Sequence, residues 1–265
     1  MNPISDTAYY CCGIRMLDAR QRRSMCSDIY AERFMDQRGC EILQRFGAEL
    51  RPNITNVARH RYIDDEVRRR LTTNRSLRVI LIGCGFDSRA FRLQGGEWIE
   101  LDEPPLITLK NEKLPAQECS NQLVRIPIEF ATEPLETKLA SFADDRPTLV
   151  VLEGVTMYLP SVAIERTLRA LRTLFPTHEV IADLMTRAFA EEYGKSIKDI
   201  IAAMGANLDP LSDPAGPFLR TGYREAHSES IVCAGFSYMR RGWLRPLMKL
   251  VSPRAVTGYT IRTFV

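Results

Sequence analysis

Two glycines and a carboxylate directly follow the first two apolar runs of the sequence. Gly83 ends the run VILIG (79–83) and Gly85 lies two residues beyond it, and Asp102 directly follows the next run, EWIEL (97–101). A G-x-G turn after a buried strand lets the backbone approach a ligand without side-chain obstruction. A carboxylate after the following strand can accept hydrogen bonds from both ribose hydroxyls of an adenosine-bearing cofactor. The spacing therefore predicts a cofactor site at the carboxyl ends of these strands, although a G-x-G pair also occurs in simple turns.

The next two apolar runs place further polar residues at the same edge. Glu129 and Phe130 follow the run 123–128 and are placed to contact adenine, although Glu129 could equally be an ordinary acid at a helix start. Glu153 ends the run 148–153, where a carboxylate leaving a buried strand needs a partner. That partner could be a ligand amine or hydroxyl, or an arginine in a structural ion pair.

The elements that must position these residues alternate between strand and helix. Strand-like runs lie at 79–83, 97–101, 123–128, 148–153 and 179–184, and helical patterns lie between them at 104–114, 133–142 and 161–175. This alternation predicts an α/β fold, a Rossmann-like open, mostly parallel seven-stranded sheet with helices on both faces. The last two strands are expected at 236–243 and 258–265 and could pair antiparallel.

Two segments fall outside this alternation. Residues 1–76 have helical patterns and no strand-like run, which predicts an N-terminal helical cap in front of a Rossmann-like domain at 77–265. Residues 185–222 combine helical stretches with the Pro- and Gly-rich piece DPLSDPAGP (209–217). This segment is too long for an ordinary connection, so we expect an inserted lid or a disordered tip.

The charge of the chain is unevenly distributed. The net charge is +3, with 30 Arg and 6 Lys, and it divides into +5 over residues 1–78, −8 over 79–219 and +6 over 220–265. Basic flanks of this kind suit an anionic ligand, because arginine binds carboxylates and phosphates bidentately, although solvated helix faces are an alternative explanation. No basic run is interleaved with aromatic residues, so nucleic acid is not an expected partner.

Cysteine usage and hydropathy indicate the cell compartment. The seven cysteines are odd in number and lack C-x-x-C spacing, so neither a disulfide framework nor a metal site is expected. No run of about 18 apolar residues occurs, and the charges near the N-terminus follow the short apolar run, the reverse of a secretory signal. These features predict a cytoplasmic protein with no membrane-spanning segment and no membrane partner, and they leave its oligomeric state open.

Several of these motifs together resemble one family. GCGFDSRAFRL (83–93), ELDEP (100–104) followed by Lys110, and LEGVTMYL (152–159) resemble the leucine carboxyl methyltransferase family, a group of class I S-adenosylmethionine-dependent methyltransferases that includes bacterial natural-product O-methyltransferases. ARHRYIDDEV (58–67) is similar to the arginine-rich helix of that family, and SDTAYYCCGIR (5–15) to its N-terminal motif. The resemblance covers roughly residues 5–185 and implies S-adenosylmethionine as the cofactor.

The resemblance implies a role for individual residues. Gly83 and Gly85 would lie against the methionine part of the cofactor, Asp87 and Arg89 would shape that loop, and Asp102 would hold the ribose.

Other implied contacts come from later strands and from the N-terminal segment. Glu129 and Phe130 would flank adenine, where the family more often has Asp-Leu, and Glu153 would face the amino-acid end of the cofactor. The candidates for the cofactor carboxylate are Arg59 with Arg61 as the runner-up, assisted by Arg15, and Thr7 is a weaker candidate for the site.

The residues also bear on the acceptor of the methyl group. His60 and Tyr158 are the candidates for contact with the reacting groups, but neither is an obvious general base, and both could be structural. An ionised carboxylate needs no base, so we expect O-methylation of a carboxylate, or of a hydroxyl, on a small natural-product metabolite or a peptide C-terminus. A nicotinamide-dependent oxidoreductase is an alternative, against which Ser88 argues by replacing the third glycine of that fingerprint. A second alternative is a catalytically inactive homologue that still binds the cofactor.

Overall fold

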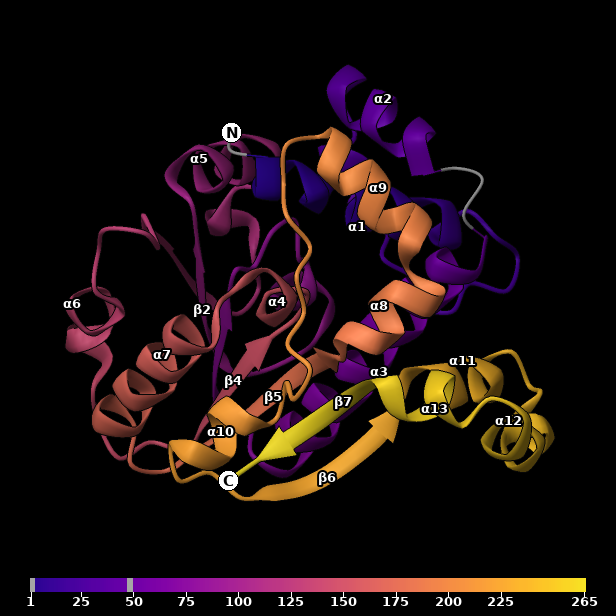
Figure 1. Ribbon diagram of the computed structural model, residues 1–265. Coiled ribbons are helices and arrows are strands. Elements are labelled where there is room, and N and C mark those ends of the chain that lie inside the picture. The colour runs from indigo at the N-terminus through magenta and orange to yellow at the C-terminus, as the bar shows by residue number, and fades with distance from the viewer. Residues whose placement is uncertain (1–2, 47–49) are drawn as a thin grey trace.

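The computed structural model describes residues 3–46 and 50–265, and a seven-stranded sheet lies at its centre (Figure 1). The strands run in the order β3-β2-β1-β4-β5-β7-β6, with β1 to β5 parallel and β7 antiparallel to both of its neighbours. The strands are β1 (Arg78–Ile82), β2 (Glu97–Asp102), β3 (Gln122–Pro127), β4 (Thr148–Leu152), β5 (His178–Met185), β6 (Glu225–Ser230) and β7 (Tyr259–Phe264). The predicted open, mostly parallel seven-stranded α/β fold is confirmed.

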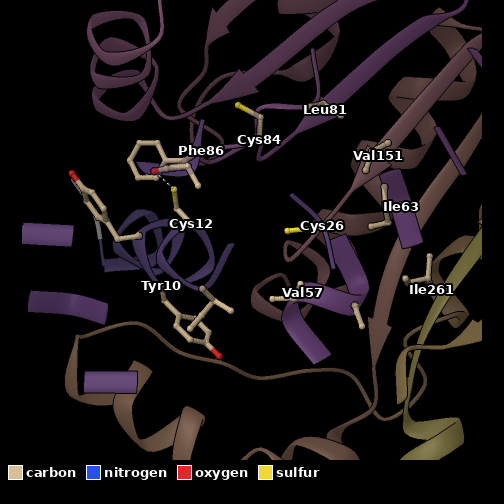
Figure 2. Packing of buried hydrophobic residues seen from close by; sticks show 14 of the residues in the cluster. Tyr10, Cys12, Cys26, Val57, Ile63, Leu81, Cys84, Phe86, Val151 and Ile261 are labelled. Carbon is tan, nitrogen blue, oxygen red and sulfur yellow. Dashed lines mark hydrogen bonds between the residues drawn. The ribbon is translucent and has the colours of Figure 1, made fainter. Parts of the chain in front are cut away.

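Alternate side chains of the buried strands face opposite sides of the sheet, and each side has its own hydrophobic cluster. Val79, Leu81 and Val151 belong to the cluster shared with the N-terminal helices, whereas Ile80 and Val150 belong to the cluster shared with α6 and α7. Figure 2 shows the first cluster, in which Val151 of β4 lies near Ile63 of α3, and Cys12 of α1 lies beside Phe86. Helices therefore cover both faces of the sheet, as predicted.

Helices are the other main elements of the described structure. The first three are α1 (Pro3–Ala19), α2 (Gln37–Phe46) and α3 (Leu50–Thr73), and those between the parallel strands are α4 (Arg89–Arg92), α5 (Pro104–Lys113), α6 (Leu135–Leu139) and α7 (Ser161–Leu174). The C-terminal helices are α8 (Arg187–Tyr193), α9 (Lys195–Ala203), α10 (Gly216–Arg220), α11 (Ile231–Tyr238), α12 (Arg245–Val251) and α13 (Pro253–Gly258). Short 3₁₀ turns are η1 (Ala31–Phe34), η2 (Ala116–Glu118), η3 (Ala140–Phe142), η4 (Thr156–Tyr158) and η5 (Gly242–Leu244). In the part of the chain that is described, no helix has the length and apolar content needed to cross a bilayer.

The segment 185–222 runs from the end of β5 to the N-terminal helices and back (Figure 1). Its helix α9 contacts α2, and Ile197 and Ile201 are buried there. On the return path, the Asp209 amide donates a hydrogen bond of 3.1 Å to the Met157 carbonyl, next to the end of β4. A lid role for this segment, and a boundary between a cap at 1–76 and a domain at 77–265, remain predictions.

The predicted strand at 236–243 is wrong. Its first residues belong to α11, which packs against α3, and η5 follows. The strand that pairs antiparallel with β7 is instead β6, at Glu225–Ser230. The sequence EAHSES has no apolar alternation because β6 is an edge strand and four of its six side chains are exposed.

Candidate functional site

A cavity of about 250 Å³ lies at the carboxyl ends of β1, β2 and β4 and is closed on one side by α1 and α3. This is the position at which open α/β sheets bind their ligands. The predicted site residues that line it are Thr7, Arg15, Arg59, His60, Gly83, Gly85, Asp87, Asp102, Phe130, Glu153 and Tyr158.

The turn after β1 brings backbone, rather than side chains, to the cavity wall. Gly83 and Gly85 have φ values of 68° and 49°, in the left-handed region that favours glycine. The amides of Gly83 and Cys84 both donate to the Leu101 carbonyl, at 2.9 and 3.0 Å, and this ties the turn to β2. A Cβ atom on Gly83 would lie 2.6 Å from Val155 Cγ2. A larger residue at position 83 would therefore push the turn into the loop after β4.

Asp102 ends β2 beside this turn, with 7% of its surface exposed. Its carboxylate accepts hydrogen bonds from the amides of Gly85 at 2.7 Å and Glu103 at 2.8 Å. Burial raises the pKa of Asp102 to about 6, although these two hydrogen bonds work in the opposite direction. Two amides satisfy only part of the acceptor capacity of a carboxylate, so Asp102 can still accept hydrogen bonds from a ligand in the cavity.

Glu153 and Arg59 meet at the end of β4. The Arg59 guanidinium donates to Glu153 at 3.0 Å, to Asp183 at 3.2 Å and to the Tyr259 hydroxyl at 2.8 Å. The only partner of its Nη2 atom among these contacts is a weak one, Cys11 Sγ at 3.8 Å. Gly154, which follows Glu153 and has a φ of 69°, brings the backbone close to this Nη2 atom. Nη2 is therefore the edge of Arg59 with the most remaining capacity to bind an anion.

Arg89 joins the carboxylates behind the cavity wall. Its side chain is fully buried and bonds to Asp64 at 2.6 Å, to Glu153 at 2.7 Å and to Asp87. Burial alone would raise the pKa of Glu153, but the charges of Arg89 and Arg59 and a hydrogen bond with His60 outweigh it and hold that pKa well below its usual range. Arg89 does not line the cavity, and it positions the carboxylates that do.

His60 lies inside the same ionic cluster and is 1% exposed. Its Nδ1 is 3.3 Å from Glu153 and 2.9 Å from Arg89, and its Nε2 is 2.7 Å from Arg92. Burial and the Arg89 charge lower the pKa of His60. Both ring nitrogens therefore face protein partners, which leaves neither of them directed at a substrate.

A second buried ion pair ties α1 to the glycine turn. Arg15 donates to Asp28 at 2.8 Å and to the Phe86 carbonyl at 2.7 Å. Asp28 also accepts a hydrogen bond from Ser88. Burial opposes ionisation, but Arg15 and Arg92 lower the pKa of Asp28 to about 2. The serine at the position of the missing third glycine thus anchors the turn to the N-terminal helices.

Three predicted residues lie outside the cavity lining. Arg89 is behind it, as described, and Arg61 pairs with Asp65 at 3.0 Å and donates to the Met25 carbonyl at 3.0 Å. Glu129 is exposed, and Glu133, four residues further along the chain, lines the cavity together with Phe130.

Tyr158 lines the cavity from η4, after the end of β4. Burial raises the pKa of the Tyr158 hydroxyl above its usual range. The phenol is therefore protonated at neutral pH and can donate a hydrogen bond, but it is a poor base.

The sequence interpretation missed Asp183 and Tyr259. Asp183 is completely buried at the end of β5 and accepts hydrogen bonds from the Gly154 amide at 2.6 Å and from the Tyr259 hydroxyl at 2.7 Å. A carboxylate inside the apolar run EVIADL was the available signal, because such a group must have partners.

His60, Asp87 and Glu153 carry the one group of potential metal ligands found among the described residues, with ligand atoms within 4.8 Å of one another. The Arg89 guanidinium contacts all three side chains. The guanidinium already occupies the position of a cation among these ligands, so a metal ion there would be repelled by its charge.

Residues 8–172 match the model of the leucine carboxyl methyltransferase family. The chain is 31% identical over 172 residues to the tetracenomycin polyketide synthesis O-methyltransferase TcmP of Streptomyces glaucescens, and that alignment covers 64% of this chain and 61% of TcmP. A protein of Mycobacterium bovis whose name places it among S-adenosyl-L-methionine-dependent methyltransferases is 24% identical, with 91% of this chain and 82% of that protein covered. The alignment with TcmP thus spans less than two thirds of that relative.

The fold is also shared with solved methyltransferase structures. Magnesium protoporphyrin IX methyltransferase (ChlM) from Synechocystis, crystallised with bound SAH, superposes with a TM-score of 0.52 at 14% identity. The superposition covers 88% of this chain and 96% of that chain. At this level of identity, the likeness shows the fold alone.

Proposed function

The chain belongs to the leucine carboxyl methyltransferase family of S-adenosylmethionine-dependent methyltransferases, and from that premise we propose that its cavity binds S-adenosylmethionine and that the protein methylates an oxygen atom of a small metabolite. The observation that carries the proposal is Asp102, a buried carboxylate with free acceptor capacity, directly beside the Gly83–Gly85 turn. A carboxylate in this position suits the two ribose hydroxyls of an adenosine cofactor.

The remaining lining residues fit the other parts of that cofactor. Phe130 offers an apolar surface for adenine, and the backbone of the glycine turn leaves room for the methionine chain. Glu153 has 12% of its side chain exposed and can accept from the cofactor's ammonium group, and Arg59 Nη2 and Arg15 are the cations available to its carboxylate. The cofactor would supply an electrophilic methyl group, and these residues would hold it and exclude water.

The residues that line the cavity offer no general base to remove a proton from the acceptor. Both nitrogens of His60 are engaged by the protein, and Tyr158 is protonated at neutral pH. An acceptor that is already ionised needs no proton removal, so we favour a carboxylate over a hydroxyl. The name of TcmP, a polyketide synthesis enzyme, supports a natural-product metabolite as the acceptor rather than a peptide C-terminus.

Calorimetry with S-adenosylmethionine and with its demethylated product tests the cofactor site. Asp102→Ala should weaken binding more than a hundred-fold, because two hydrogen bonds to a charged acceptor contribute about 3 kcal/mol or more. Glu129→Ala, an exposed acid outside the cavity, is the matched control and should bind as the parent protein does. Unchanged binding by a folded Asp102→Ala variant, or no binding by the parent protein, would refute the cofactor site.

The chemistry of the product tests the acceptor class. With methyl-labelled cofactor and a panel of aromatic carboxylic acids and phenols, we expect label in a product that mild alkali hydrolyses to methanol. A methyl ester behaves in this way and an aryl methyl ether does not. Alkali-stable label, together with a rate that rises with pH as a phenol ionises, would assign a hydroxyl acceptor instead.

A cytoplasmic location is part of the same proposal. All seven cysteines are free thiols, and four of them are buried: Cys12, Cys26, Cys84 and Cys233. Free buried thiols are typical of proteins that fold in a reducing compartment.

A further inference from the structure

Residues 239–254 form a basic and apolar projection at one edge of the molecule, here called the C-terminal projection. It contains η5 and α12, and in Figure 1 α12 lies on the outside of α11 and α13, away from the sheet. Its sequence, MRRGWLRPLMKLVSPR, has five cations and no acidic residue. These cations are Arg240, Arg241, Arg245, Lys249 and Arg254.

The apolar side chains of the projection face solvent. Trp243 is 75% exposed, Leu247 51%, Leu250 80% and Val251 69%. Four large apolar residues exposed within nine positions are more than the scattered single residues found on an ordinary surface. The arrangement is therefore typical of a surface that binds something.

Most of the positive charge of the projection is available to a partner. Arg245 is paired with Glu229 at 2.7 Å, and Arg254 lies 3.6 Å from Glu192. Within residues 3–46 and 50–265, no carboxylate is within ion-pair distance of Arg240, Arg241 or Lys249. A partner must therefore combine negative charge with an apolar phase.

We propose that the C-terminal projection binds an anionic membrane surface, with Trp243, Leu247 and Leu250 entering the boundary between headgroups and acyl chains. Interfacial segments are recognised by tryptophan and leucine beside lysine and arginine, because the first group enters the acyl boundary and the second contacts anionic headgroups. A second copy of the chain would bring like charges together, and a nucleic acid would leave the leucines without an apolar partner. The proposal departs from the expectation, drawn from the sequence, that a membrane is not a partner, and it does not depend on the methyltransferase activity.

The two tryptophans provide a direct measurement. Trp98 is fully buried on β2, whereas Trp243 is exposed, so a change of emission on binding reports Trp243. With vesicles of phosphatidylcholine and phosphatidylglycerol at low salt, we expect the full-length protein to co-sediment and its emission to shift to shorter wavelength. With vesicles of phosphatidylcholine alone, or in high salt, both signals should be strongly reduced.

Two pairs of substitutions separate the contributions. Arg240→Gln with Arg241→Gln should reduce the partition coefficient about thirty-fold, which corresponds to ~1 kcal/mol for each cation. Leu247→Ser with Leu250→Ser should also reduce it strongly. The matched control is Ile29→Ser with Val162→Ser, both 71% exposed in the parent and outside the projection, and it should bind normally.

Four results would overturn the proposal. The first is the absence of co-sedimentation with the anionic vesicles. The second is equal binding to phosphatidylcholine alone. The third is an equal blue shift with soluble polyglutamate, which would assign the surface to an acidic protein. The fourth is a dimer in sedimentation equilibrium that Leu247→Ser with Leu250→Ser dissociates, which would assign it to a second copy of this chain.

Discussion

Arg89 neutralises three carboxylates from three parts of the chain, Asp64, Asp87 and Glu153, and no surface of its own is exposed. Replacing it by methionine would leave those acids buried without their common partner. Removal of one partner from a buried ionic group costs about 3–5 kcal/mol, and we expect Arg89→Met to lower the free energy of unfolding by this amount in urea titrations.

A matched surface pair provides the control for that change. Arg169 is 61% exposed and pairs with Glu165 at 3.0 Å on α7. Arg169→Met should cost less than about 1 kcal/mol, because solvent screens the pair. The loss of unfolding free energy in Arg89→Lys should lie between those of the two methionine variants. Equal losses in the two methionine variants would mean that the Arg89 cluster adds nothing beyond an ordinary surface pair.

Asp102 makes cofactor binding dependent on pH. Its pKa in the free protein is raised to about 6, and the ionised form is the one that accepts both ribose hydroxyls. The affinity for the cofactor should be constant above pH 6 and should fall below it, approaching tenfold per pH unit, as measured by calorimetry between pH 5 and 7. A binding constant that does not change over this range would show that Asp102 is not the acceptor.

Asp102 also affects the stability of the free protein. A folded-state pKa above the unfolded value means that the contribution of Asp102 to the free energy of unfolding falls as pH rises from about 4 to 6.

At the scale of elements, the sequence was most informative where burial restricts composition. The runs 79–83, 148–153 and 179–184 match β1, β4 and β5 to within one residue at each end, because strands covered on both faces must be apolar. The edge strand β6 was missed for the opposite reason, since exposed side chains carry no pattern. The cavity residues that directly follow strands could be predicted in the same way, because the carboxyl ends of parallel strands lie along one edge of the sheet.

Contacts between distant elements could not be predicted from spacing. Glu133 rather than Glu129 lines the cavity because the chain turns into α6 only after residue 134, and nothing local in the sequence determines that path. Arg59 and Arg61 are two residues apart on α3 and so face different directions, one toward Glu153 and the other toward Asp65. Only the tertiary structure decides which of two such arginines reaches the site.

At the scale of the whole molecule, buried polar contacts and one hydrophobic cluster join the N-terminal helices to the sheet. Arg15 bonds to the Phe86 carbonyl, Arg59 to Glu153 and Asp64 to Arg89, and α1 and α3 share their apolar cluster with β1 and β4. Release of the helices alone would expose this cluster and leave buried charges unpaired. We therefore expect the helices and the sheet to unfold together.

Urea unfolding of the Trp243→Phe variant measures that coupling. Trp98 on β2 is then the only tryptophan and reports the sheet, whereas far-UV circular dichroism reports the helices, of which α1 and α3, with 17 and 24 residues, are the two longest. We expect a single transition with the same midpoint for both signals, because neither part can keep its ion pairs without the other. If ellipticity is lost at a lower urea concentration than the Trp98 signal, the N-terminal helices unfold independently and the buried network does not couple them to the sheet.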